Sequence, residues 1–243
     1  MFQDDPAVGS RRPGQWHPRI RRVQSFHELA TTPFADGVNA LCWERQQPGD
    51  YAEVVASLGP GEGIVALDED TLLTLPASAA GRKAIEFLLG DLLLLQDRGL
   101  DPVLNCIHGY PRDEDPGPVP TDVFSFHADS APIPADTWLC TYHGAPSEGL
   151  CNEEAQRRVD DPATRAELLR RFGGRDDESF RAYLAESCYD LHYAPLPSAR
   201  PFSFGVGNLW RIALEYPGCP VPPCLHRAPT TRPGDPPRLL LIS

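Results

Sequence analysis

Apolar positions in the first hundred residues follow helical spacing, interrupted by short apolar runs that suit strands. The pattern predicts a strand over 38–43 and helices over 24–32, 48–58 and 79–96. Ser25 and Glu28 form a capping-box sequence for the first helix, and Ser78 is an N-cap for the third. Apolar residues cover most of the circumference of helix 79–96, so we expect it to be largely buried against the outside of a sheet. Residues 64–75 combine two apolar runs with an acidic interruption and remain ambiguous.

From residue 103 the pattern changes to short apolar runs divided by Pro, Gly and Asp, which is typical of a β-sandwich or barrel. Strands are predicted over 103–108, 123–126, 137–142, 202–206, 209–216, 221–226 and 238–242. Between them the helical pattern returns. Asp161-Pro162 predicts the start of a helix that ends at Gly173-Gly174, and a second helix is predicted over 177–187.

These elements predict an α+β protein with a double-stranded β-helix core, that is, a jelly roll of the cupin type, carrying N-terminal helices and a helical insertion. Residues 1–22 are polar and are expected to be a flexible tail. We expect 23–243 to form a single domain. Within it, 23–100 would be a mainly helical layer, and 101–243 the β-core with an insertion at about 152–192.

Composition narrows the functional classes. The chain has 243 residues and a net charge of −12, which argues against nucleic-acid and membrane-surface binding. No segment is apolar enough to span a membrane, and the N-terminus does not resemble a secretory signal, so a cytoplasmic location is expected. Seven cysteines without a CxxC pair suit reduced thiols, although Cys219 and Cys224 flank a Pro-rich loop and could pair. The sequence does not determine the oligomeric state.

The candidate chemistry is at the end of one predicted strand. His127 and Asp129 are two residues apart, so on a strand they project to the same face. One imidazole and one carboxylate are two of the three ligands of the facial triad that binds non-haem Fe(II), and His226 is the candidate third ligand. Arg238 opens the last predicted strand, and a guanidinium suits bidentate binding of a carboxylate.

Each of these residues also has a plainer interpretation. A His-x-Asp sequence is frequent by chance, and an arginine at a strand edge is more often part of a salt bridge. The distal histidine followed by an arginine at the terminal strand is what favours a metal site. His108 and His143 are rival metal ligands, and Arg227 and Arg232 are competitors of Arg238.

Several motifs resemble the iron(II)/2-oxoglutarate-dependent dioxygenase superfamily. They are His127-Ala128-Asp129, the run from Thr137 to Tyr142, and His226 with Arg238. Most of residues 36–243 also resembles a bacterial domain family of unknown function. That likeness rests on Gly37-Val38-Asn39, Trp43-Glu44-Arg45, the stretch Cys140 to Glu148, His226-Arg227-Ala228-Pro229 and the ending Gly234 to Leu241.

The resemblance implies a set of roles. His127, Asp129 and His226 would bind Fe(II), Arg238 would hold the distal carboxylate of 2-oxoglutarate, and Tyr142 would hydrogen-bond that cosubstrate. Trp138, His143 and His108 are candidates for contacting substrate. The implied activity is that of an oxidoreductase that uses O₂ to hydroxylate or otherwise oxidise a small organic molecule, plausibly in biosynthesis.

Two alternatives remain open. The site could belong to a cupin-like metalloenzyme that chelates its substrate directly and does not use 2-oxoglutarate. The chain could instead be a non-enzymatic domain that binds a small ligand and retains a vestigial site.

Overall fold

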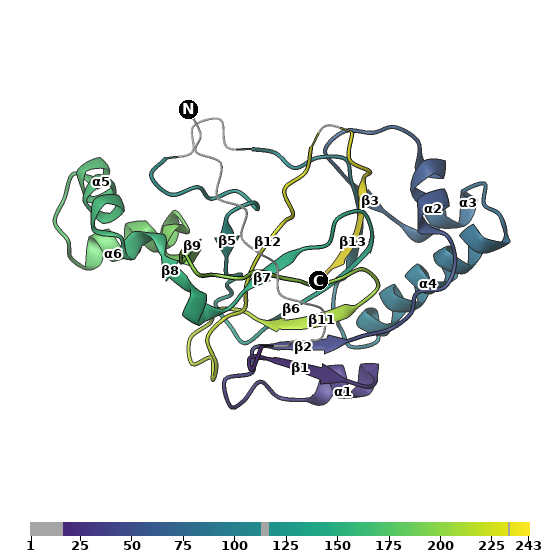
Figure 1. Cartoon of the computed structure of the whole chain (residues 1–243), viewed down its shortest axis with the longest axis horizontal. Helices are drawn as coiled ribbons and strands as arrows, with labels where there is room; N and C mark the ends of the chain where they lie inside the picture. Colours follow the sequence, from purple (N-terminus) through teal and green to yellow (C-terminus); the bar gives the residue numbers. More distant parts are fainter. Residues whose placement is uncertain (1–16, 113–116, 233) are drawn as a thin grey trace.

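The computed structural model describes residues 17–112, 117–232 and 234–243. Within these ranges the chain forms two β-sheets and several helices, a mixed α+β fold (Figure 1). Most of the expected N-terminal tail, residues 1–16, and the acidic cluster 113–115 lie outside the described residues.

The helices begin where the sequence places short polar caps. They are α1 (Phe26–Thr31), α2 (Tyr51–Leu58), α3 (Glu69–Thr74), α4 (Ala79–Gln96), α5 (Pro162–Phe172) and α6 (Glu178–Glu186), with 3₁₀ helices at Asn152–Glu154, Arg158–Asp160 and Tyr189–Leu191. Ser25 accepts the backbone N–H of Glu28, and Glu28 in turn accepts the backbone N–H of Gln24. The side chains of Ser78 and Asp161 also accept backbone N–H groups, in the first turns of α4 and α5, as their sequences predict.

A seven-stranded sheet forms the larger layer. Its order is β1 (Ile20–Val23), β2 (Ala40–Trp43), β11 (Leu209–Ala213), β6 (Asp136–His143), β13 (Arg238–Ile242), β4 (Val103–Ile107) and β3 (Ile64–Leu67). The smaller sheet has the order β10 (Phe202–Ser203), β7 (Glu148–Leu150), β12 (Leu225–Arg227), β5 (Phe126–His127), β9 (His192–Pro195) and β8 (Ala155–Arg157). Neighbouring strands are antiparallel except β1 and β2, which are parallel.

Side chains alternate across β6, and this alternation divides the molecule. Trp138, Cys140 and Tyr142 join the main core, which includes Val54 of α2 and Leu88 of α4. The helices α2, α3 and α4 therefore cover one face of the larger sheet, while α5 and α6 lie at the far side of the molecule (Figure 1). The other face of β6 is left to the smaller sheet and to the cavity described below.

Three expectations are corrected. Residues 20–22, expected in the tail, belong to β1 and pair with β2. Helix α4 is not largely buried: Leu88 is buried, but Leu93 is 58% exposed. The apolar pair Val123-Phe124 forms a turn, so the predicted strand 123–126 is reduced to Phe126–His127.

Several strands had no clear sequence signal. β7 and β8 are three residues long with polar members, and β8 lies inside the region expected to be helical. β9 starts at the expected end of that region and pairs with both β5 and β8. Such short strands are stabilised by their neighbours rather than by an alternating pattern of their own.

A buried ion pair ties α4 to the larger sheet. Asp91 of α4 is 3% exposed; it accepts hydrogen bonds from the Arg45 guanidinium and from the Tyr142 hydroxyl, the latter at 2.5 Å. We expect Asp91→Asn to lower the free energy of unfolding by about 3–5 kcal/mol, because it leaves the Arg45 charge buried and uncompensated. Urea unfolding measures this loss. Glu167→Gln, which breaks surface pairs with Arg170 and Arg171, is the control and should leave the unfolding midpoint unchanged.

Candidate active site

Two neighbouring strands of the smaller sheet bring the histidines together. His127 of β5 and His226 of β12 are directly opposite each other in the register, and their ring centroids are 4.6 Å apart. Asp129 lies just beyond β5, where its backbone carbonyl accepts the N–H of Glu215 at 2.8 Å. That hydrogen bond fixes the segment that follows β5. The Asp129 carboxylate therefore still faces the two imidazole rings, although β5 ends at His127.

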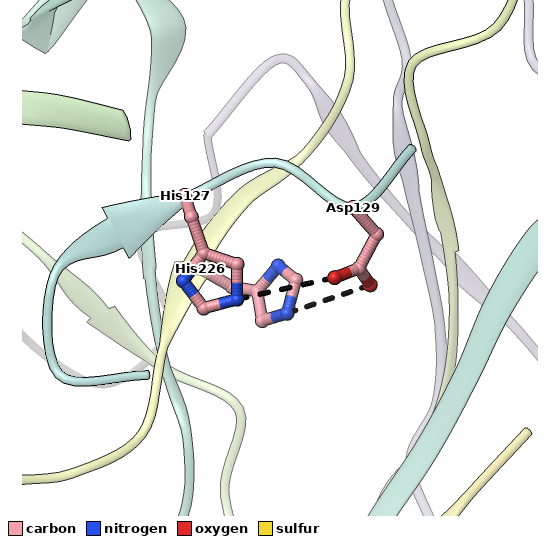
Figure 2. A group of neighbouring side chains, drawn as sticks. All are labelled: His127, Asp129 and His226. Carbon is pink, nitrogen blue, oxygen red and sulfur yellow. Dashed lines mark ion pairs between the residues drawn. The ribbon is translucent and has the colours of Figure 1, made fainter. Parts of the chain in front are cut away.

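The three side chains form a compact set of metal-ligating atoms (Figure 2). The Nε2 atom of His127 is 3.9 Å from Oδ1 of Asp129, and the Nε2 atom of His226 is 3.6 Å from Oδ2. The potential ligand atoms all lie within 4.8 Å of one another. The structure thus brings together the three residues that the sequence proposes as ligands, and such a group could hold a metal ion.

Backbone carbonyls orient both imidazoles. The Nδ1 atom of His127 is 2.8 Å from the carbonyl oxygen of Ser125, and Nδ1 of His226 is 3.4 Å from that of Cys224. A carbonyl can only accept, so these contacts favour the tautomer with the proton on Nδ1. The lone pair is then on Nε2 of each ring, the atom that faces Asp129, as in metal-binding histidines.

The electrostatics favour a neutral His127 and a charged Asp129. Burial, together with the neighbouring His226, lowers the pKa of His127 to about 4, so its ring is neutral at pH 7. Burial acts to raise the pKa of Asp129. His226 and the hydrogen bond from Thr137 outweigh burial, so the pKa of Asp129 is below its ordinary value. These are the protonation states that metal ligands require.

Thr137 fixes the carboxylate. Thr137 belongs to β6 of the larger sheet, and its hydroxyl donates a hydrogen bond of 2.6 Å to Oδ2 of Asp129. We expect Thr137→Val to weaken Fe(II) binding about 10- to 100-fold, because the carboxylate loses the bond that orients it, whereas Thr137→Ser should retain most of the affinity. Anaerobic Fe(II) titration measures both variants. Equal affinities in Thr137→Val and the unmodified protein would contradict this positioning role.

Arg238 is a buried cation at the start of β13. Its side chain is 1% exposed and donates to three hydroxyls: that of Tyr110, that of Ser147 at 3.0 Å and that of Thr141 at 3.3 Å. Its Nε atom is buried and has no hydrogen-bond partner among the described residues. Burial lowers the pKa of this guanidinium from its ordinary value.

The lack of a carboxylate beside Arg238 distinguishes this buried arginine from three partly buried ones. Arg45, Arg211 and Arg227 each have an acidic partner, but in the described part of the chain no Asp or Glu pairs with Arg238. A buried charge is costly unless it is paired. The arrangement therefore suits an anionic ligand, with hydroxyls placed to support it.

One cavity connects these groups. It has a volume of about 280 Å³, and its lining includes His127, Asp129, His226 and Arg238 together with Ser147. The metal-ligating atoms and the unpaired guanidinium therefore open on the same space. Sequence position gives no such information, since Arg238 is 111 residues from His127 by the numbering.

Two expected site residues lie elsewhere. Tyr142 stacks on Tyr51 and donates to Asp91, and Trp138 packs against Phe26, so both are in the core under the helices. The prediction that Tyr142 contacts a cosubstrate and Trp138 a substrate in this cavity is corrected. The reason is the alternation of β6, which turns Thr137, Leu139 and Thr141 toward the cavity instead.

The remaining histidine candidates also lie outside the cavity. His143 contacts the carbonyl oxygen of Pro237 through Nδ1 at 2.9 Å. His108 packs near Gly61 and lines a smaller cavity, which shares Ile107, Tyr110 and Arg238 with the first. Among the competing arginines, Arg227 pairs with Glu148 and Arg232 lines that smaller cavity.

Sequence reasoning missed the hydroxyls around Arg238. Tyr110 and Ser147 lie in loops and carry no periodic signal. The sequence could have identified Thr141, because it is next to Tyr142 on a predicted strand and therefore points to the opposite face. All seven cysteines lie in the described part of the chain and are free, so Cys219 and Cys224 are not paired.

Comparisons of the chain with protein-family models, with characterised proteins and with solved structures find no match. In the described residues no helix combines the length and apolar character needed to cross a bilayer.

Proposed function

We propose that this protein is an Fe(II)- and 2-oxoglutarate-dependent oxygenase that oxidises a small organic substrate. The observation that carries the proposal is the single cavity on which a His-Asp-His set and a buried, unpaired arginine both open. Neither feature alone is specific to one class of enzyme. Together they match the two needs of such an oxygenase, a metal with open coordination positions and an anchor for a dicarboxylate.

The strand pairing supports a double-stranded β-helix as the core. With β8 and β9 left out, eight strands follow one another along the chain from β4 to β13. In one sheet they pair in the order first, eighth, third, sixth (β4, β13, β6, β11). In the other they pair in the order second, seventh, fourth, fifth (β5, β12, β7, β10). This is the pairing that two Greek keys produce in a jelly roll. β1, β2 and β3 would extend the larger sheet, and β8 and β9 the smaller.

The donor set suits Fe(II). Two imidazoles and one carboxylate on one side of an ion leave its other positions open, which is the facial triad of non-haem iron oxygenases. His127 and His226 would bind through Nε2. Asp129 would bind through one carboxylate oxygen while Thr137 holds the group in place.

Arg238 fits the distal carboxylate of 2-oxoglutarate. Its unpartnered Nε and the hydroxyls of Ser147, Thr141 and Tyr110 form a cationic, hydrogen-bonding end to the cavity. When bound, iron and 2-oxoglutarate would supply the chemistry in which O₂ oxidises 2-oxoglutarate to succinate and CO₂ and transfers one oxygen atom to a substrate C–H group. The chain's own residues would orient both ligands and exclude water from the cavity.

Anaerobic titration tests the proposal. We expect Fe(II) followed by 2-oxoglutarate to give the weak visible charge-transfer band of the metal chelate, and admission of O₂ to yield succinate. Metal binding without the band would favour a cupin-like enzyme that does not use 2-oxoglutarate. A folded protein that binds no metal would favour a non-enzymatic ligand-binding domain. Either result would refute the proposed function.

A further inference from the structure

The cavity wall divides into two chemical parts. The polar groups of one part are the three metal-ligating side chains, Thr137 on Asp129, and the group around Arg238. The remaining wall is almost entirely aliphatic, and Asn105 is its only other polar side chain among the described residues. This remainder is where a substrate would be in contact with the protein if metal and cosubstrate occupy the first part.

Adjacent strands of the larger sheet provide the aliphatic wall. Ile107 lies between Ile64 and Arg238 in the register, and Leu240 lies opposite Asn105. Because side chains on one face recur every second residue, Ile242 continues the row beyond Leu240. The edge strand β3 thus widens the cavity wall by contributing Ile64.

The wall continues to the protein surface. Ile64 is 49% exposed, Ile242 37% and Val123 36%, although all three line the cavity. Three large aliphatic side chains of the cavity wall are therefore accessible from outside the protein. The part of a substrate that passes these side chains gains by burying aliphatic carbon.

Where the structure describes it, the aliphatic part of the wall contains no ionic partner for a charged substrate group. A charged group placed against Ile107, Leu240 and Ile242 would lose its hydration without gaining an ionic partner. Asn105 can satisfy one neutral polar group, because its amide nitrogen makes only a long contact of 3.4 Å, with the carbonyl oxygen of Val103. An amide both donates and accepts, so it suits a hydroxyl, carbonyl or amide.

From this division we infer that the substrate is uncharged and largely aliphatic where it enters the cavity, with one neutral hydrogen-bonding group that contacts Asn105. The inference rests on the proposed function for the location of the reacting carbon. It adds the substrate class, which metal and cosubstrate chemistry leave open. The cavity of about 280 Å³ must also hold the cosubstrate, so only a slender aliphatic segment fits.

The test compares octanamide with octanoate, which share a chain and differ in charge. Each is added anaerobically to the whole chain loaded with Fe(II) and 2-oxoglutarate, and the change in the charge-transfer band gives its dissociation constant. We expect octanamide to bind at least about tenfold more tightly than octanoate. Asn105→Leu should weaken the binding of octanamide and leave the binding of octanoate nearly unchanged. Octanoate binding as tightly as octanamide would overturn the inference.

A second arm needs no iron. Calorimetric titration of octanamide into the metal-free chain should show binding that weakens about tenfold in Ile64→Asp, because a carboxylate replaces part of the aliphatic wall. Val65→Asp is the matched control: it lies next along β3, is 42% exposed and does not line the cavity, so binding should be unchanged. No binding of octanamide, or equal binding in the two variants, would overturn the inference. Absence of the charge-transfer band alone would refute only the proposed function.

Discussion

Asp129→Ala is expected to weaken Fe(II) binding by at least about 100-fold and to abolish succinate formation. The carboxylate is the only anionic ligand in the candidate triad, and even the outer partners of metal ligands are worth about 10- to 100-fold in affinity. Folding should survive, because Asp129 lies beyond the strand end and its side chain is about one third exposed. Anaerobic titration gives the affinity, and circular dichroism reports the fold.

His127→Ala should give the same double loss, since each histidine supplies one of the two imidazoles. His27→Ala is its control: His27 is exposed on α1, and its replacement should alter neither metal binding nor turnover. Turnover retained in Asp129→Ala or His127→Ala would exclude the triad as the metal site. Loss of activity with metal binding intact would assign these residues a different role.

Arg238→Met is expected to raise the KM for 2-oxoglutarate about 100-fold, measured as succinate formation at increasing cosubstrate concentration. Leaving a buried carboxylate without its charged partner costs several kcal/mol, which corresponds to this factor or more. Fe(II) affinity should change little, because the hydrogen bonds of Arg238 go to Tyr110, Thr141 and Ser147 and not to the ligands.

The same substitution should not lower the thermal midpoint of the metal-free protein. Removing an arginine usually leaves its acidic partner buried and unpaired, but no such partner of Arg238 occurs among the residues that the structure describes. Arg227→Met is a matched control on β12, where the ion pair with Glu148 is lost but the cavity is untouched. A KM that does not change in Arg238→Met would place the anchor elsewhere. A large fall in its thermal midpoint would make the residue structural.

The two results together separate the candidate functions. Loss of metal in Asp129→Ala with a normal KM in Arg238→Met would favour direct chelation of substrate by the metal. Weaker Fe(II) binding in Asp129→Ala together with a raised KM for 2-oxoglutarate in Arg238→Met is the pattern expected when different residues hold the metal and the cosubstrate. In that case the aliphatic wall near Ile64 and Asn105 would select the organic molecules that reach the metal.

The sequence by itself determined the starts of several helices, the terminal strand and the candidate chemistry. Caps such as Ser78 and Asp161 fix helix starts because their side chains accept orphan backbone N–H groups, which needs only neighbouring residues. The terminal strand Arg238–Ile242 has the bounds that its apolar run predicts. The spacing of His127 and Asp129, with His226 as a third candidate, named the three residues that the structure brings together.

Only the tertiary structure decided which face of each strand meets the cavity. β6 is buried on both faces, so its pattern does not separate Thr137 and Thr141, which face the site, from Trp138 and Tyr142, which pack under the helices. The hydroxyls of Tyr110 and Ser147 reach Arg238 from loops. Contacts of this kind depend on how distant segments pack, and no local pattern encodes them.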